Sequence, residues 1–120
     1  MKTDVLIIGG GPGGAAMAMF LIREGIKPVI LEQEEFPRFH IGESLLPFSM
    51  KAFRRMDVLE KFEHRFLKKY GGEFFSACCD KGVKFYFKDA YRSQTDHSYQ
   101  VTRGDFDKLL LDHARENGST

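Results

Sequence analysis

The sequence predicts an α/β fold that begins with a parallel βαβ unit and contains an inserted antiparallel β-hairpin. Three observations support this prediction. An apolar, β-branched run at residues 4–8 leads directly into a cluster of glycines. A helix-like segment and a second short apolar run follow within the first 32 residues. Apolar and polar residues later alternate over residues 83–88, which is the two-residue period of a strand.

The first 32 residues read as strand, glycine turn, helix and strand. The run at residues 4–8 is typical of a strand buried on both faces of a parallel sheet. Residues 15–24 are apolar on almost every side, and Gly25 follows where a helix end favours a residue that tolerates positive φ. Residues 28–32 form the second strand, and a right-handed crossover is the usual connection between two such strands.

A long loop and helical segments follow the βαβ unit. Residues 33–44 have no periodicity and predict a loop, and Pro47 can begin a helix. The helical pattern continues over residues 58–67 after a bend. The apolar face of the first of these helices is predicted to consist of Phe48, Ala52, Phe53 and Met56.

The last third of the chain predicts a hairpin, a strand and a helix. Residues 73–79 and 83–88 are expected to pair around an Asp80-Lys81-Gly82 turn. Residues 98–102 are a strand candidate, and the helix after them ends at Asn117-Gly118. Since a parallel strand normally follows such a helix, we expect residues 1–120 to be the amino-terminal part of one domain, truncated relative to a complete enzyme. The apolar stripe of the helix is formed by Phe106, Leu109, Leu110 and Ala114.

Composition excludes several classes of partner. The chain has 18 basic and 17 acidic residues, so its net charge of +1 gives no reason to expect nucleic acid or a membrane surface. No run approaches the roughly 20 apolar residues that cross a bilayer, and no signal peptide is recognisable, which predicts a cytoplasmic protein. Adjacent Cys78 and Cys79, expected to be reduced and partly buried, and four scattered histidines predict no metal site.

The glycine turn has the spacing of a dinucleotide-binding fingerprint, G-x-G-x-x-G. Gly9 would permit the tight turn, Gly11 would let a pyrophosphate approach the backbone, and Gly14 would let helix and strand pack closely. Glu32 ends the second strand 18 residues after Gly14, where a carboxylate accepts hydrogen bonds from ribose hydroxyls and disfavours NADP. Pro12 and Gly13 complete the turn, whose helix points free N–H groups at phosphates. These features leave FAD and NAD open.

The loop Phe36-Pro37-Arg38-Phe39-His40-Ile41-Gly42-Glu43-Ser44-Leu45-Leu46-Pro47 resembles a segment of the flavin-dependent halogenases and their monooxygenase-like relatives. Residues 69–74 and 101–110 also resemble that family, in the expected order. The resemblance implies a Rossmann-like, glutathione-reductase-like domain and favours FAD over NAD. It further implies flavin contacts by Arg38, Gly42, Glu43, Ser44 and Arg103. The alternatives are a surface loop in which Glu43 and Ser44 only cap the next helix, and a solvated Arg103.

The resemblance also implies a catalytic lysine, which best matches Lys69. A lysine amine can hydrogen-bond hypohalous acid or carry the halogen, although Lys68 leaves the register open and a solvated basic face is an alternative. The implied activity is O2- and halide-dependent halogenation of a small organic substrate, with electrons supplied by a flavin reductase or NAD(P)H. Since the chain contains no tryptophan, it lacks the halogenase W-x-W-x-I-P motif. A flavin-dependent hydroxylase, a geranylgeranyl-reductase-like enzyme and a non-catalytic nucleotide-binding fragment therefore remain alternatives.

Overall fold

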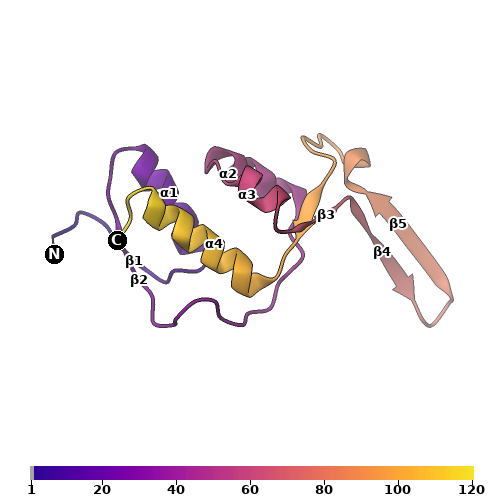
Figure 1. Cartoon of the computed structure of the whole chain (residues 1–120). Helices are drawn as coiled ribbons and strands as arrows, with labels where there is room; N and C mark the ends of the chain where they lie inside the picture. The colour runs from indigo at the N-terminus through magenta and orange to yellow at the C-terminus, as the bar shows by residue number, and fades with distance from the viewer. Residues whose placement is uncertain (1) are drawn as a thin grey trace.

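The computed structural model describes residues 2–120 as an elongated α/β arrangement of 60 × 29 × 24 Å. Two parallel strands, β1 (Leu6–Ile8) and β2 (Val29–Leu31), pair with Leu6 opposite Val29 and flank helix α1 (Pro12–Arg23) in sequence. Helix α4 (Arg103–Glu116) packs against α1, and both termini lie at this end of the molecule (Figure 1). The predicted parallel βαβ unit is therefore present, although α1 starts at Pro12 rather than at residue 15.

The central part of the chain forms short helices. A 3-10 turn η1 (Pro47–Ser49) leads into α2 (Met50–Arg55), and α3 (Leu59–Glu63) follows after a bend at Asp57, whose φ is 56°. The predicted apolar face is wrong at Phe48, which is 92% exposed. Met50 is buried in its place because the 3-10 turn rotates the first residues of this segment relative to an ideal α-helix.

The hairpin extends away from the helices (Figure 1). Strands β4 (Gly71–Ser76) and β5 (Lys81–Tyr86) are antiparallel, and a second 3-10 turn η2 (Phe87–Asp89) follows β5. The hairpin prediction is confirmed, but the turn spans residues 77–80 rather than 80–82. Cys78 and Cys79 lie in this turn and are exposed, so their predicted partial burial is wrong.

A second pair of strands joins the hairpin to the helical part. Strand β3 (Leu67–Lys69) pairs antiparallel with β6 (Ser98–Gln100), with Lys69 opposite Ser98. The strand at residue 98 was expected, whereas its pairing with residues 67–69 was not, because the predicted helix ended at residue 67 and the next predicted strand began at residue 73. This pairing positions the loop before β6 and the start of α4.

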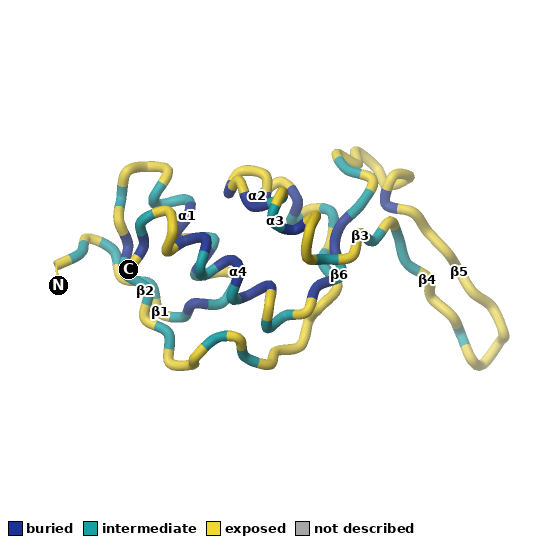
Figure 2. Tube along the Cα trace, in the orientation of Figure 1, coloured by how far each residue is buried: buried dark blue, intermediate teal, exposed yellow. Residues whose placement is uncertain are grey.

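The core lies between α1, α2, α3 and α4, where buried residues concentrate (Figure 2). The ring of Phe62 lies at its centre, 5.0 Å from the centroid of Phe53 and 5.5 Å from that of Phe106, in edge-to-face and tilted arrangements. The apolar stripe of α4 predicted from Phe106, Leu109, Leu110 and Ala114 is confirmed, since all four residues are buried.

The two-stranded sheet is less buried than its sequence suggested. Leu6 and Ile8 are 52% and 78% exposed, so the expectation of a strand buried on both faces is wrong for these residues. The backbone of Thr120 continues the sheet beside β2: its carbonyl accepts from Ile30 N at 2.7 Å, and its N–H donates to the carbonyl of Pro28 at 3.2 Å. No helix within residues 2–120 is long and apolar enough to cross a membrane.

Candidate cofactor site

The glycine turn connects β1 to α1 in a geometry that only glycine allows at two positions. Gly9 has a φ of 101°, in the region that disfavours any side chain, and its N–H donates to the carbonyl of Leu31 at 2.7 Å. A Cβ on Gly14 would lie 1.9 Å from the carbonyl oxygen of Gly9. Helix α1 therefore packs directly on the turn, as the fingerprint predicts for its third glycine.

The first turn of α1 is open toward the carboxyl ends of β1 and β2. Gly11 is its N-cap residue and contributes no side chain, Pro12 occupies the first helical position, and no acidic residue lies in the first turn. A Cβ on Gly13 would meet nothing within 4 Å. The first N–H groups of a helix have no intrahelical partner, and together with the positive end of the helix dipole they form the arrangement that binds a phosphate.

A groove of about 570 Å³ lies beside this turn, at the carboxyl ends of the two parallel strands. Ligands bind at this edge in open α/β sheets. Its walls include Gly9, Glu32, Glu34, Arg38 and His40.

Glu32 is held against the glycine turn by backbone hydrogen bonds. Its Oε2 accepts from Gly10 N at 2.6 Å, and its Oε1 accepts from Glu34 N at 2.9 Å. These bonds, that of Glu34 foremost, lower the pKa of the Glu32 carboxyl. The carboxylate is therefore ionised and oriented at the groove, with lone pairs left for ribose hydroxyls.

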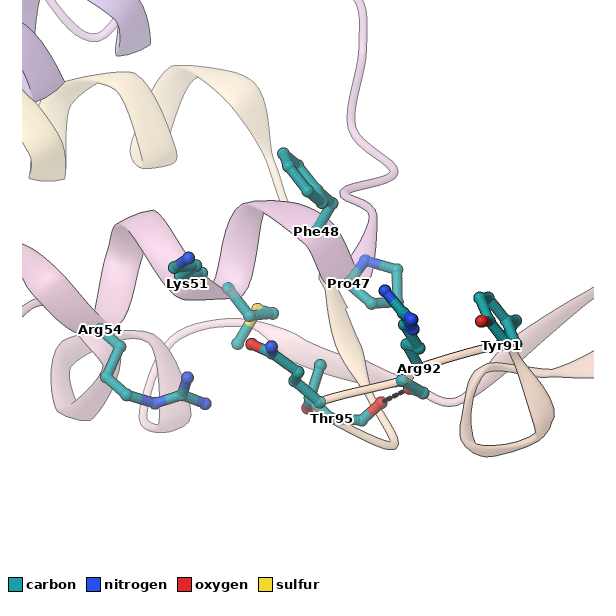
Figure 3. Close-up of a pocket in the computed structure, with 10 residues that line it drawn as sticks. Pro47, Phe48, Lys51, Arg54, Tyr91, Arg92 and Thr95 are labelled. Carbon is teal, nitrogen blue, oxygen red and sulfur yellow. Dashed lines mark hydrogen bonds between the residues drawn. The ribbon is translucent and has the colours of Figure 1, made fainter.

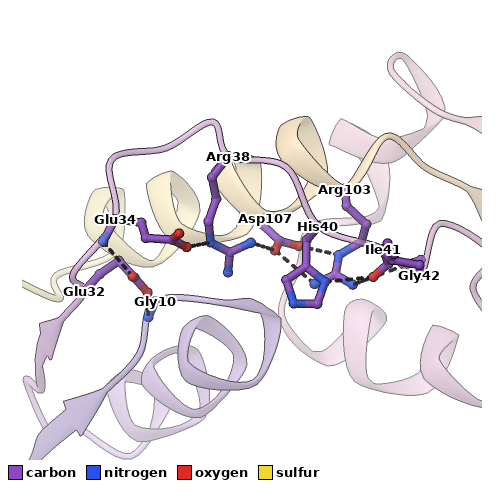
Figure 4. A network of polar contacts seen from close by, with 9 residues as sticks. All are labelled: Gly10, Glu32, Glu34, Arg38, His40, Ile41, Gly42, Arg103 and Asp107. Atoms are coloured by element: carbon purple, nitrogen blue, oxygen red, sulfur yellow. Dashed lines mark hydrogen bonds and ion pairs between the residues drawn. The ribbon is translucent and has the colours of Figure 1, made fainter.

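Two arginines and a buried aspartate tie the loop at residues 33–44 to α4 (Figure 4). Asp107 is fully buried; it accepts from Arg38 Nη1 at 3.0 Å and from Arg103 Nε and Nη2 at 2.8 and 3.0 Å. Arg38 also pairs with Glu34 at 2.8 Å, and its Nη2 lies 3.4 Å from where a Cβ on Gly11 would be. Its positive charge thus lies next to the proposed pyrophosphate position.

Asp107 is a site residue that the sequence analysis did not identify, because its contact with Arg38 joins residues that are 69 positions apart in the chain. The available signal was its i,i+4 spacing from Arg103. Its hydrogen bonds raise the pKa of Arg103. The alternative in which Arg103 is solvated is wrong, since its side chain is 13% exposed and Nη1 donates to the carbonyl of Ile41 at 2.7 Å.

The Gly42-Glu43-Ser44 segment lies along β6 as a third strand would. Val101 N donates to the carbonyl of Glu43 at 2.8 Å, and Ser44 forms a bridge with Gln100. Gly42 has a φ of 103°, and a Cβ there would lie 3.0 Å from Arg103 Nη1. The alternative in which Glu43 and Ser44 cap the next helix is wrong, because the N-cap is Leu46 and η1 has no side-chain cap.

Lys69 lies at the end of β3 and meets this segment. Its Nζ donates to Ser44 Oγ and lies 5.4 Å from the ring centroid of Phe87. Partial burial lowers the pKa of the Lys69 amine. Lys68 points elsewhere, pairs with Glu63 at 3.2 Å and has a raised pKa through that hydrogen bond.

The structure therefore brings the expected residues into two groups rather than one. The first group consists of the glycine turn, Glu32 and Arg38. The second group consists of Gly42, Ser44 and Lys69 along β6. Asp107 connects the two groups through its hydrogen bonds with Arg38 and Arg103. The open helix end, the oriented carboxylate and the nearby guanidinium fit the ADP half of a dinucleotide. Residues 2–120 contain no group of three or more histidine, cysteine or acidic side chains placed to hold a metal.

Comparison with known proteins places this geometry in a family. The family described as "FAD binding domain" matches residues 2–120. A flavin-dependent halogenase of Armillaria mellea is 40% identical over 119 residues, covering 98% of this chain and 22% of that protein. A 1H-pyrrole-2-carbonyl-[peptidyl-carrier protein] chlorinase of Pseudomonas fluorescens is 37% identical over 133 residues, covering 97% of this chain and 30% of that protein.

Solved structures agree with these matches. A flavoprotein/dehydrogenase from Cytophaga hutchinsonii superposes with a TM-score of 0.91 at 36% identity, covering 100% of this chain and 30% of that one. The myxobacterial chondrochloren halogenase, an FAD-dependent enzyme, superposes with a TM-score of 0.89 at 34% identity, covering 98% of this chain and 27% of that one. The chain thus spans less than a third of the length of these relatives. The predicted resemblance to halogenases and the choice of FAD are confirmed: this chain belongs to the family of FAD-binding domains.

Proposed function

We propose that this chain is the amino-terminal, Rossmann-like FAD-binding part of a halogenase-like flavin monooxygenase that acts on a small organic substrate. The observation that carries the proposal is the open N-terminus of α1 beside the groove at the strand ends, with the Glu32 carboxylate oriented toward the same groove. The match over residues 2–120 and the halogenase relatives support it.

Each group of residues has a distinct task in this proposal. The N–H groups of the α1 first turn and the Arg38 guanidinium bind the pyrophosphate, and Glu32 accepts hydrogen bonds from the ribose. FAD, when bound and reduced by a flavin reductase or NAD(P)H, would supply two electrons to O2, and the halide would supply the other two, so that hypohalous acid and water form. Gly42, Glu43, Ser44 and Arg103 form the flavin-facing side of the site.

Lys69 is the proposed catalytic residue. Its amine, held by Ser44 Oγ and less easily protonated than an exposed lysine, hydrogen-bonds hypohalous acid or carries the halogen to the substrate. Lys68 does not share this position because Glu63 holds it elsewhere.

FAD binding is tested by three matched glycine variants, titrated with FAD, ADP and NAD by isothermal calorimetry. Gly11→Ala introduces a methyl group where the pyrophosphate approaches, at a φ of −66° that alanine tolerates, so FAD affinity should fall by about ten-fold or more. Gly13→Ala has open space and keeps its N–H, so FAD affinity should be nearly unchanged while the helix gains about 0.5–1 kcal/mol. Gly14→Ala should prevent folding through its 1.9 Å contact.

Unchanged FAD affinity in Gly11→Ala would contradict the assigned pyrophosphate position. Equal affinity for ADP and FAD would show that the segment at residues 42–44 does not contact flavin. Failure to bind any of the three ligands would support a non-catalytic fragment.

Halogenation is tested with the full-length protein that contains this chain, supplied with FAD, a flavin reductase, bromide and an aromatic acceptor. Lys69→Met should lower brominated product by about a hundred-fold or more while FAD binding persists, and Lys68→Met should retain most activity. A hydroxylated or reduced product without any brominated one would favour the second candidate, a flavin-dependent hydroxylase or reductase. The similarity to a protein named as a flavoprotein/dehydrogenase is the observation that keeps this candidate.

A further inference from the structure

A second pocket lies outside the FAD site, where η1 and α2 face the loop at residues 91–95 (Figure 3). Its volume is about 280 Å³, large enough for a small molecule rather than a dinucleotide. Pro47 and the buried Met50 form part of its wall. It shares no lining residue with the groove beside the glycine turn.

Three cationic side chains surround this pocket. Lys51 and Arg54 are spaced i,i+3 on α2, and Arg92 comes from the facing loop (Figure 3). No carboxylate lines the pocket, and over residues 2–120 none of these cations forms an ion pair. By contrast, Lys61, Lys68 and Lys108 are each paired with an acidic side chain. The positive charge at the pocket is therefore uncompensated by the chain itself.

Two exposed aromatic rings flank the same pocket. Phe48 is 92% exposed and Tyr91 is 87% exposed, although both are residues that normally bury much of their surface. The guanidinium of Arg92 lies 5.1 Å from the ring centroid of Tyr91, and Arg92 has a φ of 54°, which non-glycine residues adopt infrequently. Tyr91 and Arg92 thus offer a ring face and a cation side by side at the pocket, and Phe48 lines it from η1 with its ring exposed.

We propose that this pocket binds the phosphoryl group of a small phosphorylated molecule that also carries a planar ring. A phosphoryl group presents several acceptor oxygens and up to two negative charges, which suits three cations better than a single carboxylate does. Phe48 and Tyr91 contact the ring, while Lys51, Arg54 and Arg92 bind the oxygens. The inference goes beyond the proposed halogenase function and does not require it.

The test uses the 120-residue chain labelled with ¹⁵N, with amide chemical shifts followed during titration with phenyl phosphate. Saturable shifts are expected at residues 48–54 and 91–95, with a Kd of about 1 mM or lower. Inorganic phosphate lacks the ring, phenol lacks the charge, and benzoate replaces the phosphoryl group by a carboxylate, so all three should bind at least about five-fold more weakly. Titrations run with and without saturating FAD separate this pocket from the cofactor site.

Matched variants locate the contacts. Arg54→Gln and Arg92→Gln should each weaken phenyl phosphate binding about five-fold, which is the most that one exposed ion pair usually contributes. Lys27→Gln removes an exposed charge outside the pocket and should leave binding unchanged. Phe48→Ala and Tyr91→Ala should abolish the advantage of phenyl phosphate over inorganic phosphate, at little cost in stability because both rings are exposed.

Three results would overturn the proposal. Shifts at Gly11, Gly13 and Gly14 instead of at the pocket would place the ligand at the glycine turn. Benzoate binding as tight as phenyl phosphate would remove the phosphoryl preference. Unchanged affinity in both arginine variants would show that the cations do not form a site.

Discussion

The buried Asp107 carboxylate offers the sharpest test of how the cofactor loop is held. It is the counter-charge of Arg38 and Arg103, from which it accepts hydrogen bonds of 2.8 to 3.0 Å. Replacing it with the isosteric asparagine keeps the volume and removes the charge. Both guanidinium groups then face each other across a buried amide that can neutralise neither.

The size of the expected loss of stability follows from the burial of the Asp107 carboxylate. Removing one partner of a buried ion pair costs about 3–5 kcal/mol. The arginine side chains remain 15% and 13% exposed, so solvent compensates part of the loss. We expect Asp107→Asn to lower the free energy of unfolding by about 2–4 kcal/mol, a large share of the stability of a small domain.

Urea denaturation followed by far-ultraviolet circular dichroism measures this change, and an unchanged m-value shows that the unfolding reaction is the same. Asp105→Asn is the matched control, since Asp105 is exposed in the first turn of α4 and should cost only about 0.5 kcal/mol through the helix dipole. Limited proteolysis should also cut residues 33–44 faster in Asp107→Asn. If the two variants are equally stable, the network does not hold the loop and the reasoning is refuted.

Three further predictions concern individual side chains. The lowered pKa of Glu32 means that its contribution to stability is complete above the pKa of the unfolded carboxyl and is lost as pH falls through the lowered folded pKa. Glu32→Gln should therefore flatten the acid limb of a stability-against-pH curve, and an identical acid limb would contradict the assigned hydrogen bonds. As pH is raised, acetic anhydride should modify Lys69 before Lys68, because burial lowers the pKa of Lys69 and the hydrogen bond to Glu63 raises the pKa of Lys68. Peptide mass spectrometry measures the extent of acetylation of each lysine, and identical pH profiles for the two would argue against the difference between their pKa values. Ser98 Oγ is buried without a hydrogen-bond partner within residues 2–120, so Ser98→Ala should raise the free energy of unfolding by about 1 kcal/mol. A lower melting temperature of this variant in thermal denaturation would show instead that the Ser98 hydroxyl does form a stabilising hydrogen bond.

The parts of the fold that were predicted correctly have local causes. The βαβ unit follows from an apolar strand, glycines that turn the chain, and a helix that ends at Arg23, two residues before Gly25, whose φ is 81°. The apolar stripe of α4 follows from a period of 3.6 residues, and the hairpin from alternation. The errors lie at boundaries: the 3-10 turn that exposes Phe48 and the shift of the hairpin turn to residues 77–80 depend on a few backbone angles.

The residues of the candidate site likewise fall into those that local sequence predicts and those that only the fold brings together. The positions that bind through the backbone or through spacing, namely the glycine turn and Glu32, could be predicted from the sequence, because they require only a local conformation and the end of a neighbouring strand. Tertiary structure alone decided that Asp107 joins Arg38, 69 residues away, to Arg103. It also decided that Lys69 rather than Lys68 reaches Ser44, and that three cations with no ion pair among residues 2–120 surround one pocket. Contacts between distant residues depend on how the chain closes on its core, and the free energy of that closure is distributed over many side chains rather than encoded in any one motif.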